Sequence, residues 1–360
     1  MIKRAALLLA DGTRFDGEGI GGDALALGEA VFYTGMTGYE EALTDPSYAG
    51  QILTFTFPMV GNYGISGKAA QHPHACVAGA VIKKISRHPS HHDSKTDLPA
   101  WLAAERVPTL VGVDTRRLTT VLREHGTIRA ALAVGEEPLA RMEAALVPYA
   151  RETTTTGLVG QVAAHAVERF ATKNPGRHIV LIDCGVKSAI LRDLLALGAR
   201  VTVVPYTATH DEIWALAPDA VVISPGPGDP EDVPETIATV RSLIGELPMF
   251  GVCLGHQLLA IACGGRTYKL PYGHRGGNQP VKDLVRDTVL VTAHNHGYAV
   301  DGASLPSELE ATMINLNDGT NEGFRHRELP ISAVQFHPEA SPGPFDARFL
   351  FAEWLSSLDS

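Results

Sequence analysis

One cysteine in this sequence stands where a strand should end and a helix should begin. Apolar residues precede Cys253, and Leu254 and Leu258 follow it at helical spacing, with Gly251 and Gly255 two residues to either side. This Gly-x-Cys-x-Gly pattern has the logic of a nucleophile elbow, a turn so tight that only glycine fits beside the nucleophile. The helix N-terminus there favours a negatively charged thiolate. The pattern indicates a nucleophilic cysteine, with a buried structural cysteine as the alternative.

A thiol nucleophile needs a general base, and the base needs a group that orients it. His337, Pro338 and Glu339 directly follow residues 331–336, an apolar run that predicts a buried strand. The glutamate can hold the imidazole in one tautomer once the chain turns at the proline. A histidine and a glutamate two residues apart are often only a surface pair, but the apolar lead-in favours a catalytic pair.

Acyl transfer also needs backbone donors for the oxyanion. The N–H of Leu254, the residue after the nucleophile, is one candidate. Gly226, in the loop of residues 225–230, is the second, because its glycines let the backbone approach a substrate closely. An ordinary turn would not need two glycines and three prolines in six residues.

Alternating strands and helices should position these groups from residue 178 onward. Strands are expected at 178–183, 200–205, 220–224 and 331–336, and helices at 188–197, 235–244 and 347–358, with a capping box over 209–212. This alternation predicts an α/β fold with a doubly wound, mostly parallel sheet that binds ligands at the C-terminal ends of its strands. Beyond residue 265 the segments become hairpin-like, as at 289–293, 311–315 and 321–325.

Residues 1–150 predict a smaller mixed α/β domain without a catalytic spacing of its own. Strands are expected at 5–9, 14–20, 29–34, 51–57, 77–82 and 128–134, and helices after the N-cap Asp114 and at 137–149. Residues 151–177 are polar and punctuated by glycine, which indicates a linker, with a short helix expected within 162–170. The loop with His88, His91 and His92 is interpreted as solvated surface rather than a metal site.

Composition narrows the class of protein. The 360 residues give room for two domains, and a net charge of −10 argues against a nucleic acid or an anionic membrane as partner. The four cysteines show neither a zinc-type pair spacing nor a disulfide framework. No segment approaches transmembrane length, so we expect a cytoplasmic protein.

The three motifs, in their order along the chain, resemble those of the triad-type (class I) glutamine amidotransferases. Further segments resemble the small chains of carbamoyl-phosphate synthetases over essentially the whole length: residues 35–48, 61–64, 114–118, 273–278, 294–298 and 339–344. The resemblance includes the N-terminal domain, which other glutaminases lack. Two departures are visible: Pro225 stands where many relatives have Asn, and Tyr298 where many have Phe.

The resemblance implies Cys253 as nucleophile, His337 as general acid and base, Glu339 as its orienter, and Gly226 and Leu254 as the oxyanion hole. It implies that L-glutamine is held by Ser47, Gly226, Gly228, Leu254, Gln257, Asn295, Gly297 and Tyr298. It implies no metal ligand and no cofactor in this chain; ATP and magnesium would be bound by a separate large synthetase chain in a heterodimer that can assemble further. The glutaminase of another synthesis, such as that of anthranilate or guanylate, and a catalytically silent regulatory subunit remain as alternatives.

Overall fold

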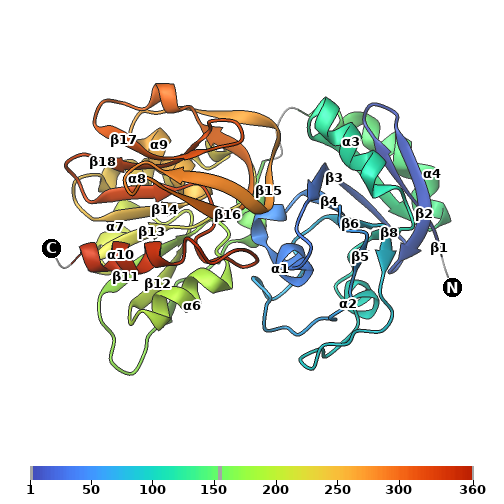
Figure 1. The fold of residues 1–360 in the computed structure, drawn as a ribbon, viewed down its shortest axis with the longest axis horizontal. Coiled ribbons are helices and arrows are strands. Elements are labelled where there is room, and N and C mark those ends of the chain that lie inside the picture. The colour runs from blue at the N-terminus through green and yellow to red at the C-terminus, as the bar shows by residue number, and fades with distance from the viewer. Residues whose placement is uncertain (1–2, 153–155, 359–360) are drawn as a thin grey trace. The chain divides into compact units, whose positions relative to one another are not determined.

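The structure is a computed structural model that describes residues 3–152 and 156–358. The chain divides into two compact units, residues 1–155 and 156–360 (Figure 1). Each unit has hydrophobic clusters of its own, and each is described separately below.

Strands of the first unit close into a barrel in the order β1–β2–β8–β6–β4–β3–β9. Its strands are β1 (Lys3–Leu9), β2 (Arg14–Ile20), β3 (Ala24–Tyr33), β4 (Gln51–Phe55), β6 (Gly79–Ile82), β8 (Thr109–Val111) and β9 (Ile128–Val134). The neighbours β3–β4, β4–β6 and β6–β8 are parallel and the other pairs antiparallel, so the barrel is a mixed sheet. A separate small sheet pairs β5 (Met59–Val60) with β7 (Lys84–Ile85).

Helices cover this barrel because the strand side chains alternate between two apolar faces. The helical segments are α1 (Tyr39–Thr44), η1 (Pro46–Tyr48), α2 (Leu98–Ala104), α3 (Thr115–His125) and α4 (Glu136–Tyr149). Leu132 packs in one cluster with Leu118 and Leu122 of α3, whereas its neighbour Ala131 packs with α4. The predicted cap of α3 is confirmed, since Asp114 Oδ1 accepts a hydrogen bond from the backbone N–H of Arg117 at 3.0 Å.

One sheet runs through the second unit in the order β10–β12–β11–β13–β14–β19–β18–β17–β15–β16. Its strands are β10 (Glu168–Phe170), β11 (His178–Asp183), β12 (Arg200–Pro205), β13 (Ala220–Ile223), β14 (Met249–Val252), β15 (Thr267–Asp283), β16 (Thr288–Val300), β17 (Leu309–Asn315), β18 (Asn321–His326) and β19 (Ile331–Val334). From β12 to β19 the neighbours are parallel, as predicted, and the remaining pairs are antiparallel.

Helices lie on both faces of the parallel part, which confirms the doubly wound arrangement (Figure 1). They are α5 (Leu158–Val162), α6 (Ser188–Ala196), α7 (His210–Trp214), α8 (Pro234–Leu243), α9 (Leu254–Ala262) and α10 (Phe349–Ser357), with the short turns η2 (Pro230–Asp232) and η3 (Gly302–Ser304). Val221 and Met249 pack with α7, α8 and α9, while the adjacent Val222 and Phe250 pack with α6 and α10. The capping box of Thr209 and Glu212 is confirmed at the start of α7.

The structure corrects several local expectations. The short helix expected within 162–170 is wrong: α5 ends at Val162, and residues 168–170 form β10, which pairs with β12. The strand predicted at 289–293 is part of a longer one, since β16 has 13 residues, and its partner β15, with 17 residues, was not predicted. The sequence patterns did not indicate α2 or β8. Among the described residues, no helix combines the length and the apolar character needed to cross a membrane.

Candidate active site

Four neighbouring parallel strands lead into the loops that carry the expected chemistry. In the order β11–β13–β14–β19, their C-terminal ends are followed by Lys187, Gly226, Cys253 and His337, respectively. Parallel strands bring these ends to one edge of the sheet. The edge is therefore where residues separated by up to 150 positions meet.

Cys253 occupies a strained turn between β14 and α9. It is the N-cap of α9 and has φ 55° and ψ −103°, a backbone conformation that residues with a side chain rarely adopt. A Cβ on Gly251 would lie 2.5 Å from the carbonyl oxygen of Gly255, and a Cβ on Gly255 would lie 2.2 Å from that of Ile223. Both glycines are thus required by close approach, and the predicted strand–turn–helix is confirmed.

The thiol is buried between polar groups of β16 and of the segment directly after β19. Cys253 is 2% exposed, and its Sγ donates toward the carbonyl oxygen of Asn295 at 3.7 Å. The side-chain amide of Gln335 donates to the same sulfur from 3.7 Å. Gln335 was not predicted; its available signal was a polar residue within the apolar run before His337.

His337 and Glu339 form the pair that the motif predicts. His337 Nδ1 lies 2.7 Å from Glu339 Oε1, and both residues are buried. The same carboxylate oxygen lies 2.8 Å from Nζ of Lys187, which is only 1% exposed. Lys187 was not predicted. Its one sequence signal is a cation at the start of α6, where the helix dipole disfavours positive charge.

The neighbouring charges shift the pKa values of His337 and Glu339. Burial lowers the pKa of His337, but the Glu339 carboxylate and, more weakly, Cys253 raise it by more, so the pKa is raised overall. Burial raises the pKa of Glu339, yet Lys187 and His337 together lower it well below its ordinary value. His337 Nε2 is buried and makes no hydrogen bond to the described residues. That nitrogen remains for the proton of the reacting groups.

The loop after β13 lies against the start of α9. A Cβ on Gly226 would lie 2.2 Å from the carbonyl oxygen of Cys184 and 2.8 Å from Leu254 Cδ2, so only glycine fits there. Leu254 begins α9, and backbone N–H groups in a first helical turn have no acceptor within the helix. The carbonyl of Pro225 accepts the hydroxyl of Ser224 at 2.8 Å. The structure thereby places Gly226 beside Leu254.

Most of the expected glutamine-binding residues surround this elbow. Gln257 in α9 donates through Nε2 to the carbonyl oxygen of Tyr298 at 2.8 Å and to Gln335 Oε1 at 3.0 Å. Asn295, Gly297 and Tyr298 follow one another in β16, whose Asn295 carbonyl already meets the thiol. The amide of Gln257 therefore links α9 to the strand expected to hold the substrate. Gly228, with φ 90°, lies in the loop of residues 225–230.

Comparison with known proteins places the chain in a family. Residues 180–356 match the family model "Glutamine amidotransferase class-I", and residues 7–132 match "Carbamoyl-phosphate synthase small chain, CPSase domain". The chain is 48% identical to the carbamoyl phosphate synthase small chain of Symbiobacterium thermophilum over 98% of each chain. It is 45% identical to those of Listeria monocytogenes, over 100% of this chain and 98% of that one, and Bacillus cereus, over 98% and 96%. The chain belongs to the carbamoyl phosphate synthase small-chain family.

In this small-chain family member, Ser47 lies in the first unit and its role stays a prediction. It belongs to η1, where its backbone N–H donates to Asp45 Oδ1 at 2.9 Å. A serine in such a turn usually bonds nearby backbone through its hydroxyl. Here Ser47 Oγ is buried and makes no hydrogen bond to the described residues. The hydroxyl thus has no local structural use of the ordinary kind.

The loop with His88, His91 and His92 lies at the surface of the first unit. His88, His91 and His92 are exposed, and the rings of His91 and His92 stack with centroids 4.3 Å apart. Asp93 is close enough to complete a group of three possible metal ligands with them. Exposed groups of this kind are frequent on protein surfaces, so the loop keeps its interpretation as solvated surface.

Proposed function

We propose that this chain is the glutamine-hydrolysing subunit of a carbamoyl phosphate synthase. The observation that carries the proposal is the thiol of Cys253 on its elbow beside the buried pair His337–Glu339, in a chain of this family. The two motifs come from adjacent parallel strands, since Val252 of β14 pairs with Val334 of β19. Together they supply the nucleophile, the base and the orienting carboxylate that acyl transfer needs.

The reaction runs in two acyl-transfer steps. The sulfur of Cys253 attacks the side-chain carboxamide carbon of L-glutamine while His337 takes the thiol proton. His337 then returns this proton to the amide nitrogen, so that ammonia leaves and a γ-glutamyl thioester remains. A water molecule, deprotonated by His337, attacks the thioester carbon; glutamate leaves and the protonated histidine returns its proton to the thiolate. Backbone N–H groups of Gly226 and Leu254 stabilise the oxyanion in both steps.

The L-glutamine substrate is held by the residues that the resemblance to the family implies. Around the elbow they come from the loop after β13, from α9 and from β16: Gly226, Gly228, Leu254, Gln257, Asn295, Gly297 and Tyr298. Ser47 supplies a hydroxyl for the polar α-amino or α-carboxylate end of glutamine, supported by its buried oxygen without a hydrogen bond. Nζ of Lys269 lies over the Tyr298 ring, 5.9 Å from the ring centroid, so a cation lies beside this substrate-binding residue.

The ammonia passes to a separate large chain that makes carbamoyl phosphate for arginine and pyrimidine synthesis. We expect ATP, magnesium and bicarbonate to be bound by that partner, because this chain has no Gly-x-x-x-x-Gly-Lys phosphate loop and binds none of them in the mechanism above. The two chains form a heterodimer that can assemble further. Residues 1–150, which carry no catalytic spacing, are proposed as the partner-contacting domain, and residues 178–360 as the glutaminase domain.

Replacing the nucleophile tests the proposal. In the complex with the large chain, Cys253→Ala should abolish carbamoyl phosphate synthesis from glutamine, by on the order of 10³-fold or more, and preserve synthesis from added ammonium. Cys263→Ala is the matched control, since this thiol lies at the other end of α9. Retained glutaminase activity in Cys253→Ala would overturn the mechanism. Hydrolysis without any ammonia transfer to the large chain would instead favour another amidotransferase, and an inactive wild type would favour a silent subunit.

A further inference from the structure

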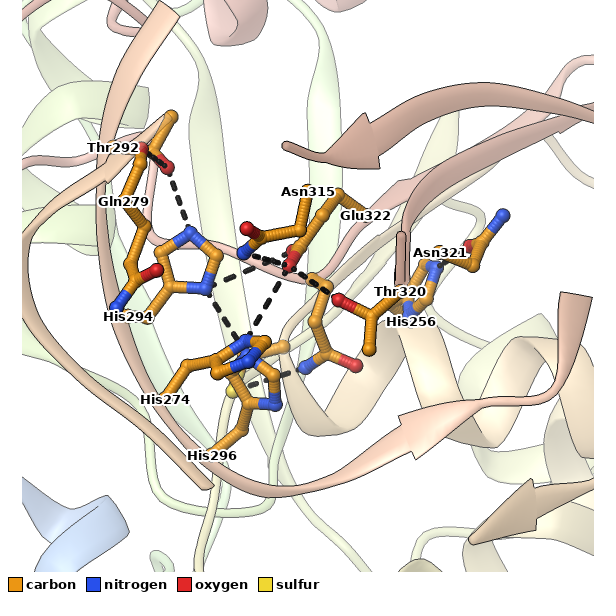
Figure 2. A network of polar contacts seen from close by, with 12 residues as sticks. His256, His274, Gln279, Thr292, His294, His296, Asn315, Thr320, Asn321 and Glu322 are labelled. Atoms are coloured by element: carbon orange, nitrogen blue, oxygen red, sulfur yellow. Dashed lines mark hydrogen bonds and ion pairs between the residues drawn. The ribbon is translucent and has the colours of Figure 1, made fainter. Parts of the chain in front are cut away.

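Three histidines and a glutamate converge in the second unit, one peptide away from the residue whose carbonyl meets the thiol. They are His274 of β15, His294 and His296 of β16, and Glu322 of β18 (Figure 2). All are buried, and one potential ligand atom from each lies within 4.8 Å of the others. No metal site was predicted at these residues, which come from three strands.

The hydrogen bonds around the two histidines of β16 fix where their free lone pairs lie. His296 Nδ1 lies 2.8 Å from the carbonyl oxygen of Tyr298, which can only accept, so the proton is on Nδ1 and Nε2 is bare. His294 Nε2 lies 2.7 Å from the hydroxyl of Thr292, which itself donates to the carbonyl of Gln279 at 2.9 Å. That hydroxyl then accepts from His294 Nε2–H, and His294 Nδ1 is bare.

The other two members also have their outer atoms engaged and their inner atoms left over. His274 Nε2 lies 2.9 Å from Asp318 Oδ2, while its Nδ1 makes no hydrogen bond to the described residues. Glu322 Oε1 accepts from Asn315 Nδ2 at 3.0 Å and from Thr320 at 3.3 Å, whereas its buried Oε2 has no hydrogen-bond partner among the described residues. Metal-binding histidines characteristically give their second nitrogen to a carboxylate, a carbonyl or another outer partner.

The spacing of the inner atoms fits a tetrahedral cation. Among the inner atoms, His294 Nδ1 lies 3.1 Å from His296 Nε2 and 3.7 Å from Glu322 Oε2. His274 Nδ1 lies 3.6 Å from Oε1, the other oxygen of the same carboxylate. Ligands at the roughly 2.0–2.1 Å zinc–nitrogen distance are roughly 3.3 Å apart in a tetrahedron. We propose that His274, His294, His296 and Glu322 bind one divalent transition-metal ion, with zinc as the ion that best suits three imidazoles and a carboxylate.

The facing lone pairs of His294 and His296 agree with this assignment. Without a cation between them, the two bare nitrogens of His294 and His296 would face each other at 3.1 Å with no proton to share.

A proton network without metal is the competing arrangement. If the Thr292 hydroxyl turned from Gln279 to donate to His294 Nε2, His294 Nδ1–H could donate to His296. The two arrangements differ in a measurable way. Only the arrangement with bare inner nitrogens binds a metal ion stoichiometrically and with the spectrum of a four-coordinate site. A metal ion bound here would also affect the thiol, since Asn295 lies between the two histidines and its carbonyl accepts from Cys253.

The test is a titration of the full chain, without a histidine tag, with Co²⁺ and then with competing Zn²⁺. We expect one equivalent of Co²⁺ with the strong visible absorption of tetrahedral coordination, displaced by one equivalent of Zn²⁺, and a rise of the melting temperature on binding. His294→Gln and Glu322→Gln should each weaken binding more than about a hundredfold, and Thr292→Val, which removes only an outer partner, about 10–100-fold. Circular dichroism checks that each variant folds.

The exposed histidine loop supplies the matched control. The double variant His91→Ala, His92→Ala removes the other group of possible ligands and should leave the stoichiometry and spectrum unchanged. The proposal is overturned if the wild type binds no stoichiometric Co²⁺, if its spectrum is that of six-coordinate Co²⁺, or if the double variant alone abolishes binding. The wild-type spectrum decides even if the buried variants fail to fold.

Discussion

Nζ of the buried Lys187 lies 2.8 Å from Glu339 Oε1, the oxygen that also lies 2.7 Å from His337 Nδ1. One carboxylate oxygen is thus held between an ammonium group and an imidazole, all three buried. Lys187 comes from the loop after β11, two strands away from β14 in the sheet. The lysine therefore fixes the carboxylate that fixes the base, and it keeps the carboxylate charged.

Lys187→Met should damage both stability and turnover. Removing one partner of a buried ion pair leaves the other charge uncompensated, which typically costs about 3–5 kcal/mol. We expect a lower free energy of unfolding in urea and a reduced kcat for glutamine hydrolysis, because Glu339 no longer holds His337 in one position. The control is Lys68→Met, which removes an exposed lysine paired with Asp93. Equal effects of the two substitutions would show that Lys187 has no special role.

The buried trio should also give stability a defined pH dependence. Glu339 has a folded pKa below its ordinary 4.5, so its contribution is present above pH 4.5 and is lost as the pH falls toward the folded value. His337 has a folded pKa above its ordinary 6.5, so its contribution is complete below pH 6.5 and is lost as the pH rises through the raised value. Both are fully present only between these limits.

The measurement is the free energy of unfolding of the wild type and of Glu339→Gln across pH 3 to 9. The difference between them should be nearly constant between about pH 5 and 6.5 and should shrink on the acid side. A difference that grows as the pH falls below 4.5 would contradict a lowered pKa for Glu339.

Ser47→Ala should raise KM for glutamine more than it lowers kcat. A hydrogen bond to a charged substrate group is worth about 1.5–3 kcal/mol, roughly ten- to hundredfold in affinity, and acts in ground and transition states alike. The melting temperature should change little, because the Ser47 hydroxyl makes no hydrogen bond to the described residues. Ser90→Ala, at an exposed position of the same unit, is the control. An unchanged KM would remove Ser47 from the substrate site.

Gly255→Ala should disrupt the elbow. The added Cβ would lie 2.2 Å from the backbone oxygen of Ile223, a contact that only a shift of β13 or α9 can relieve. We expect loss of most glutaminase activity and a lower melting temperature. Gly302→Ala serves as control, because its Cβ would meet nothing nearer than Asn321 Cβ at 3.8 Å. Activity close to that of the wild type in Gly255→Ala would show that the turn tolerates more than its geometry implies.

The sequence by itself determined the parts of the site whose geometry is local. The elbow at Cys253, the pair His337–Glu339 and the loop at Gly226 each lie within a few residues, so spacing alone encodes how their atoms meet. The alternation of strands and helices from residue 178 also predicted a parallel sheet, because covering both faces needs apolar strands and amphipathic helices. The corrections fall where the signal is weak, as at β10 and α5, whose few residues show no clear period.

Only the tertiary structure decided which distant residues meet. Lys187 reaches Glu339 because β11, β13, β14 and β19 are neighbours, and strand order is a long-range property that no local pattern contains. Register decided the histidine cluster: irregularities in the ladder of β15 and β16 place His274 directly opposite His296. A shift of one residue would turn every side chain of a strand to the other face of the sheet. Sequence spacing sets what one segment can do, whereas register and strand order set which segments act together.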